Sequence, residues 1–100
     1  MAKKSNELAG DRPEVIDTYG WILLHNGDKK KALTLLQDSV SKAPENPDIR
    51  YHLAQAMYDN GKYQQSKKEL DRLLRDYSGF SEQAAAAKLL TKLSAQLEIN

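Results

Sequence analysis

The segment PEVIDTYGWILLHNG, residues 13–27, is matched 34 residues further on by PDIRYHLAQAMYDNG, residues 47–61. Both segments open with a proline and an acidic residue, and both close with Asn-Gly. The correspondence continues beyond them at the same offset, where Leu36 pairs with Leu70. A fixed period of this length is typical of proteins built from tandem structural repeats. The sequence therefore predicts a repeat array.

Prolines, glycines and capping residues divide the chain into five expected helices, and no stretch shows the two-residue alternation of a strand. Proline favours the first position of a helix, and glycine favours the position just after its end. The expected limits are Pro13 (cap Asp11) to Asn26-Gly27, cap Asp28 to Pro44, Pro47 (cap Asn46) to Asn60-Gly61, Tyr63 to Ser78-Gly79, and a last helix capped by Ser81. The sequence thus predicts an all-α fold.

Small residues recur at the repeat offset where neighbouring helices would cross. Gly20 matches Ala54 on the first helix of each pair, and Ala32 matches Ser66 on the second. Because a small side chain lets two helix backbones approach closely, these positions predict tight crossings. The residues expected to fill the space around the crossings are Tyr19, Leu23 and Leu36 with their equivalents Leu53, Met57 and Leu70.

This pattern resembles the tetratricopeptide repeat family. The matching residues are Ile16, Tyr19, Gly20, Leu23, Gly27, Ala32, Leu36, Ser39 and Pro44, then Leu53, Ala54, Met57, Gly61, Ser66 and Leu70. Arg50, Leu73 and Ser78 depart from the pattern, as residues of terminal repeats do. The resemblance implies a right-handed α-solenoid of antiparallel helix pairs. Its expected parts are a leader (1–12), two repeats (13–46 and 47–80) and a C-terminal capping helix (81–100).

A narrower resemblance rests on DTYGW at residues 17–21 and APENPDIRYHLA at residues 43–54. Both look like the C-terminal repeats of long bacterial tetratricopeptide proteins, some of which belong to envelope systems for exopolysaccharide export and exosortase sorting. The resemblance implies a fragment of a longer bacterial protein, cytoplasmic or periplasmic, with the envelope favoured. Residues 5–12 align with residues 39–46, so the leader is either the end of a lost upstream repeat or a vector-derived tail.

Composition argues against several classes of function. The net charge of +1 gives no field that attracts nucleic acid or an anionic membrane. Without cysteine there are no disulfides and no thiolate metal sites. His25 and His52 lie on different helices and lack the i, i+4 partner of a metal-binding pair, and Glu14 and Asp17 are expected to be solvated. No apolar stretch approaches the roughly 20 residues that span a bilayer. We therefore expect no enzyme, no cofactor, no nucleic-acid partner and no membrane insertion.

The concave face supplies the candidate site, because the family geometry implied by the resemblance lines it with the first helices. The candidate binding residues are Glu14, Asp17, Trp21, Leu24, His25, Asp48, Tyr51, Gln55, Tyr58 and Asp59. Aromatic side chains are common anchors at interfaces, and four carboxylates favour a neutral or basic peptide over an acidic one. The alternative for Trp21 is packing between adjacent first helices. A basic outer surface is expected from Lys29, Lys30, Lys67, Lys68, Arg72 and Arg75.

Three functions fit this surface. The first is a non-enzymatic module, cut from a longer array, that binds a protein or peptide in the groove. The second is a terminal cap with a purely structural role. The third is self-association into a weak homodimer through the open N-terminal edge, near Ile16 and Leu33.

Overall fold

The computed structural model describes residues 12–99, which form five α-helices: α2 (Pro13–His25), α3 (Lys29–Lys42), α4 (Pro47–Asp59), α5 (Tyr63–Asp76) and α6 (Gln83–Ile99). Residues 12–99 contain no β-strand, so the expected all-α fold is confirmed. The leader up to residue 11, including the expected cap Asp11, lies outside the described residues.

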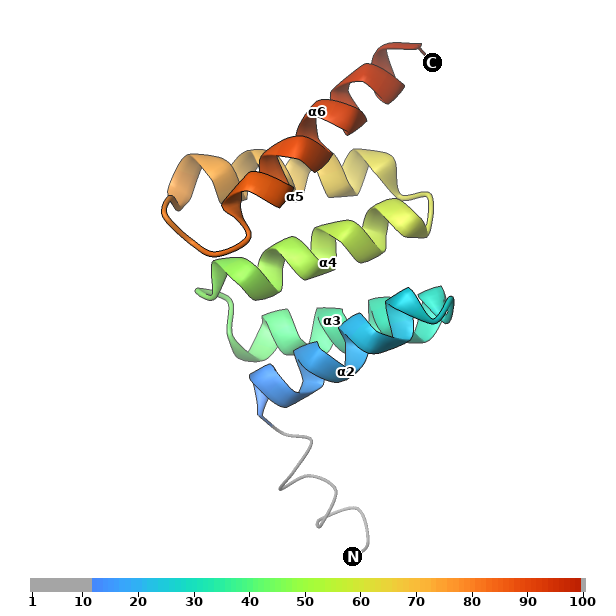
Figure 1. Ribbon diagram of the computed structural model, residues 1–100, viewed down its shortest axis with the longest axis vertical. Helices are drawn as coiled ribbons and strands as arrows, with labels where there is room; N and C mark the ends of the chain where they lie inside the picture. Colours follow the sequence, from blue (N-terminus) through green and yellow to red (C-terminus); the bar gives the residue numbers. More distant parts are fainter. Residues whose placement is uncertain (1–11, 100) are drawn as a thin grey trace, which may run out of the picture.

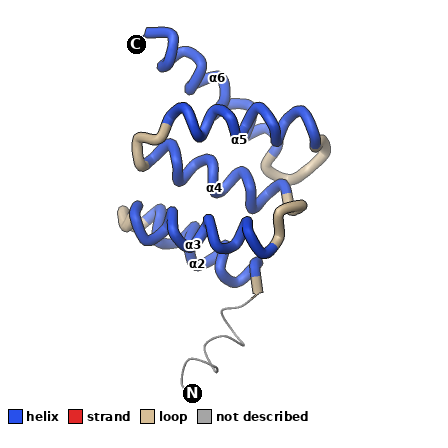
Figure 2. Tube along the Cα trace, turned by 180° about the vertical axis from the view of Figure 1, so that it is seen from behind, coloured by secondary structure: helices blue, strands red, loops and turns tan. Residues whose placement is uncertain are grey.

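The helices form two layers, with α2, α4 and α6 in front and α3 and α5 behind them (Figure 1). The view from behind shows α3 and α5 in front (Figure 2). Three connections, residues 26–28, 43–46 and 60–62, are so short that the helices they join run antiparallel. Helix α4 contacts each of the other four helices. It therefore carries the longest run of buried residues, and the other four helices pack around it.

The two Asn-Gly segments end α2 and α4 in the same way. Gly27 has φ +92° and Gly61 has φ +79°, a left-handed conformation that glycine adopts without steric cost. After α2, the Asp28 N–H donates to the Leu23 carbonyl at 2.9 Å. After α4, the Lys62 N–H donates to the Met57 carbonyl at 2.8 Å, the equivalent bond. These bonds satisfy the last carbonyls of each helix, as a Schellman motif does.

The structure confirms only some of the helix caps that the sequence predicts. Asn46 caps α4 as predicted, because its Oδ1 accepts from the Ile49 N–H at 3.2 Å. Asp28 stands at the cap position of α3 without a side-chain capping bond. The prediction of Ser81 as the cap of α6 is wrong: that helix begins at Gln83, and Glu82 supplies its first accepting carbonyl, to the Ala86 N–H at 2.9 Å.

The small residues do mark close crossings. Gly20 is buried, and a Cβ placed on it would lie 2.9 Å from Cγ of Leu36 on α3. Ser66 on α5 is fully buried, and its Oγ donates to the Ala54 carbonyl on α4 at 2.8 Å. Real Cβ contacts are longer than 2.9 Å, so α2 and α3 cross at a distance that only glycine permits without adjustment. The predicted tight crossings are confirmed.

The prediction that Tyr19 belongs to the core is wrong. Tyr19 is 60% exposed, whereas its repeat equivalent Leu53 is 5% exposed. Leu53 packs against residues of α2 and α3, but no described element covers the corresponding side of α2. Val15 and Ile22 are exposed on the same side, and we call these three residues the open edge: Val15, Tyr19 and Ile22. Ile16 and Leu33, which were expected at this edge, are buried.

Candidate functional site

A hollow of about 290 Å³ lies between α2 and α4, lined by Trp21, Leu24, His25, Tyr51, Gln55 and Asp59. All six are among the ten residues that the sequence predicts for the groove. A second hollow of about 290 Å³ continues from it between α4 and α6, lined by Tyr51, Gln55, Ala85, Lys88, Leu89 and Lys92. Because Tyr51 and Gln55 line both hollows, we treat the two as one feature, the α2–α4–α6 groove.

Hydrogen bonds order the α4 side of this groove. The Tyr51 hydroxyl donates to Gln55 Oε1 at 3.3 Å, and Gln55 Nε2 donates to Asp59 Oδ1 at 2.9 Å. These residues are four apart, so they lie on one face of the helix. Burial, followed by the negative charges of Glu82 and Asp59, raises the pKa of Tyr51 above its usual value of 10.0. The Tyr51 hydroxyl therefore lies in a negative field.

Trp21 packs between neighbouring first helices and also lines the hollow. Its ring is half-buried, with centroids 4.1 Å from His52 and 6.0 Å from Tyr51 on α4. On its own helix it meets the edge of His25 at 4.6 Å. The packing role that the sequence left open is thus observed. Part of the ring remains accessible from the groove.

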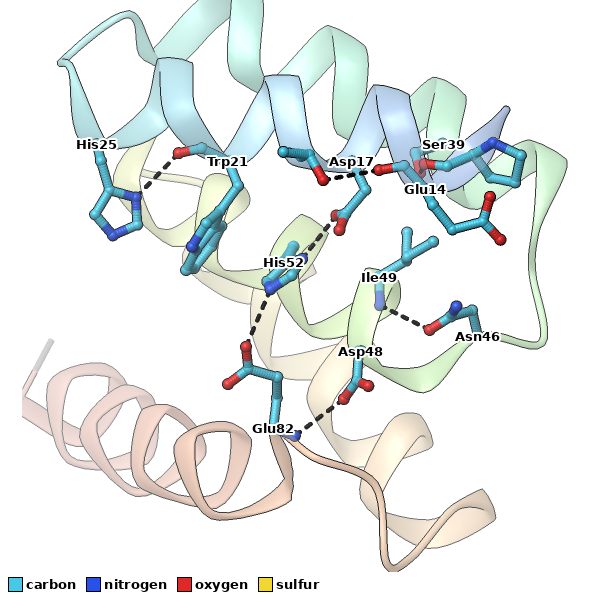
Figure 3. A network of polar contacts seen from close by, with 12 residues as sticks. Glu14, Asp17, Trp21, His25, Ser39, Asn46, Asp48, Ile49, His52 and Glu82 are labelled. Atoms are coloured by element: carbon cyan, nitrogen blue, oxygen red, sulfur yellow. Dashed lines mark hydrogen bonds and ion pairs between the residues drawn. The ribbon is translucent and has the colours of Figure 1, made fainter. Parts of the chain in front are cut away.

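Beneath the groove, His52 lies between two carboxylates from different parts of the chain (Figure 3). Its Nδ1 is 2.7 Å from Asp17 Oδ1, and its Nε2 is 3.2 Å from Glu82 Oε2. Burial alone would lower the pKa of His52, but the hydrogen bond and charge of Asp17, then those of Glu82, raise it above 6.5 overall. Asp17 was expected to be solvated. That expectation is wrong, because its side chain is largely buried against His52.

The other predicted site residues lie outside the hollow between α2 and α4. Glu14 is exposed beside the open edge, where it lines a separate hollow of about 410 Å³. Asp48 accepts from the Glu82 N–H at 2.9 Å, which fixes the turn before α6 (Figure 3). Tyr58 donates to Gln96 Oε1 at 3.2 Å and so ties α4 to α6. Asp48 and Tyr58 therefore position α6 and do not line the groove.

Sequence reasoning missed the contribution of α6 to the groove. Lys88 and Lys92 are exposed there, and Lys92 Nζ lies 5.3 Å from the centre of the Tyr58 ring. A signal was present in the sequence, because Ala85, Leu89 and Lys92 are four and three residues apart and so share one face of a helix. Of the six basic residues expected on the outer surface, five are exposed: Lys29, Lys30, Lys68, Arg72 and Arg75. Lys67 is half-buried and pairs with Asp71.

Within residues 12–99, no three His, Asp or Glu side chains are grouped so that they could hold a metal ion. No helix in the same range is both long and apolar enough to cross a bilayer.

A sequence model of the tetratricopeptide repeat family matches residues 23–95. Together with the paired helices, this match shows that the chain belongs to the tetratricopeptide repeat family, whose repeats are in general protein-interaction modules. The chain is also 30% identical over 95 residues to the Vi polysaccharide export protein VexE of Salmonella typhi. The match covers 92% of this chain and 14% of that protein. No solved structure matches the chain significantly.

Proposed function

We propose that this chain is a non-enzymatic interaction module that binds a neutral or basic peptide, or a partner helix, in the α2–α4–α6 groove. One observation carries the proposal: Trp21, Tyr51 and Asp59 line a single hollow between two first helices. Rigid aromatic rings give contact area at a low cost in conformational entropy, and such rings are frequent anchors of binding energy.

Charge gives the groove its expected preference. Asp59 is half-buried and ends the hydrogen-bonded series of Tyr51, Gln55 and Asp59. The Tyr51 hydroxyl already lies in the negative field of Glu82 and Asp59. An acidic peptide would add like charge at this place, whereas a basic side chain would meet a carboxylate. Lys88 and Lys92 lie further along, in the part lined by α6. We therefore place the basic or neutral segment of the ligand in the hollow between α2 and α4.

Replacing Asp59 with asparagine should weaken binding of basic peptides about fivefold to tenfold, or about 1–1.4 kcal/mol, because it removes charge and keeps shape. Isothermal titration calorimetry with synthetic peptides of graded net charge measures the effect. The matched control is Asp71→Asn on α5, an exposed carboxylate paired with Lys67 in the other layer. Equal affinities for Asp59→Asn and wild type with every basic peptide would contradict the charge preference.

A second candidate function rests on the open edge. We propose that a further repeat covers this edge in a longer protein, because the equivalent face of α4 is covered by α2 and α3. The chain spans 14% of its curated relative, which leaves room for such repeats. Because that relative is named as a polysaccharide export protein, envelope proteins of export systems are the first partners to screen. A terminal cap with no ligand of its own remains the structural alternative to groove binding.

Left uncovered, the open edge should cause weak self-association. Sedimentation velocity over a concentration series should show a rising sedimentation coefficient for the wild-type chain. Tyr19→Lys should abolish the rise, since it places a charge in the centre of the apolar edge. Gln37→Lys, on an exposed site of α3, should leave it unchanged. A constant coefficient at every concentration would refute self-association and leave the groove proposal intact.

A further inference from the structure

His52 joins three helices of the front layer at one point. It projects from α4, its Nδ1 meets Asp17 on α2 at 2.7 Å, and its Nε2 meets Glu82 at 3.2 Å, immediately before α6. The ring is buried, and the half-buried Trp21 ring lies over it with centroids 4.1 Å apart (Figure 3). These contacts link α2 and the start of α6 to α4 beside the α2–α4–α6 groove.

The geometry specifies which form of the ring fits. An ionised carboxylate accepts hydrogen bonds and cannot donate them, whereas a neutral imidazole carries a proton on only one of its two nitrogens. A neutral His52 could therefore donate to Asp17 or to Glu82 but not to both, and its second nitrogen would turn a lone pair towards a carboxylate oxygen. The doubly protonated imidazolium donates to both. The indole face of Trp21 favours the cation as well.

The charged and titratable groups around His52 come from each packed element. Helix α2 supplies Asp17, and the turn before α6 supplies Glu82, whose N–H binds Asp48 of α4. On α4 itself, the Tyr51 ring lies 5.7 Å from the His52 ring. Arg50 precedes His52 by two residues and so points to the other side of α4, where it pairs with Glu69 of α5 at 3.3 Å. No described charged group of α3 contacts the ring.

We propose that protonated His52 is a positioning residue that ties α2 and the start of α6 to α4, so that the shape of the groove changes with pH. Its meaning for ligand binding rests on the proposed function, but the conformational link itself does not. When the proton leaves, one of the two bonds to carboxylate is lost and the freed side faces repulsion. Glu82 is the contact that yields first, because it is longer and its side chain is more exposed than that of Asp17.

The direction of the pH effect follows from the sign of the shift. The pKa of His52 is raised above its usual 6.5, because the contributions of Asp17 and Glu82 outweigh the lowering by burial. A group whose pKa is raised by folding contributes its full stabilisation when the pH is below its pKa in the unfolded chain. That contribution is lost as the pH rises through its pKa in the folded protein. The bridge that His52 forms between Asp17 and Glu82 is therefore complete in mildly acidic solution. It is lost as the pH rises above 6.5 and through the raised pKa of His52.

A pH titration followed by NMR between about pH 5.5 and pH 9 tests this, without any peptide. The His52 ring signal should titrate with a midpoint above 6.5. Backbone amide signals around Asp17 and over the first turn of α6, residues 82–86, should move with the same midpoint. In His52→Gln, the titration of those amides at this midpoint should vanish.

Two further variants keep the test decisive if His52→Gln does not fold. Asp17→Asn and Glu82→Gln each remove one negative charge and keep the shape of the side chain, so each should lower the midpoint of the His52 ring. A ring midpoint at or below 6.5, or amides of α6 that do not follow it, would overturn the proposal. A histidine that did not position α6 would leave the amides of residues 82–86 out of the shared titration. Failure of every peptide to bind would refute the proposed function and leave the titration result standing.

Discussion

Replacing Leu36 with alanine should lower the free energy of unfolding by about 2–5 kcal/mol. Leu36 is fully buried in the cluster shared by α2, α3 and α4. Removing its side chain loses burial and leaves a cavity that the three helices cannot close without moving. The total free energy of unfolding of a domain is about 5–15 kcal/mol, so this loss would remove a large share of it.

Urea denaturation followed by circular dichroism measures the loss. The matched control is Leu97→Ala near the end of α6, where the leucine is half-buried and belongs to neither core cluster. It should cost far less than Leu36→Ala. Equal effects of the two changes would contradict the assignment of Leu36 to the centre of the core.

Gly20→Leu should destabilise the chain by about 2 kcal/mol through overpacking. The first added carbon would already lie 2.9 Å from Leu36 Cγ and 3.3 Å from Leu35 Cβ, and three more carbons would follow. Side-chain rotation cannot move Leu35 Cβ, and rotation of Leu36 is restricted because its side chain is fully buried in a packed cluster. Leucine regains roughly 0.8–1 kcal/mol of helix propensity over glycine, which offsets part of the cost.

A double-mutant cycle separates overpacking from other causes. In Gly20→Leu/Leu36→Ala, the new leucine can occupy space that Leu36 has left, so the double mutant should lose less than the sum of the single losses. Ala87→Leu, at an exposed position of α6, controls for adding the same side chain to a helix and should be nearly neutral. Simple additivity would show that α2 and α3 do not cross at Gly20.

Much of the fold could be predicted because its signals are local. Pro13 and Pro47 begin α2 and α4, and the two Asn-Gly segments end them, since both residue types act on their own backbone. The crossings at Gly20 and Ala54 could be predicted because a small residue occurs at the same position in both repeats. Tyr19 was misjudged because its helical spacing is that of a core residue. Its exposure depends on whether another element packs against that side of α2. The spacing of residues within one helix gives no information on this.

The groove was predicted in part. Six of the ten predicted residues line the hollow between α2 and α4, because residues three or four apart share a helix face. The His52 contacts could not be predicted, since Asp17 and Glu82 lie 35 and 30 residues away in the sequence. Tyr51 is only 6% exposed, because α6 packs beside it. The placement of α6 in turn depends on its packing against α4 and α5 and on hydrogen bonds from Asp48 and Tyr58, all of which join residues far apart in the sequence.

Chemical-shift mapping on ¹⁵N-labelled protein with a peptide panel of graded charge tests the central claim, binding in the α2–α4–α6 groove, most directly. The account predicts that neutral or basic peptides shift the amides of Trp21, His25, Gln55 and Asp59 most strongly, while the second layer stays unchanged. Shifts concentrated on the exposed Lys29, Lys68 and Arg72 of that layer, or strongest with acidic peptides, would contradict it.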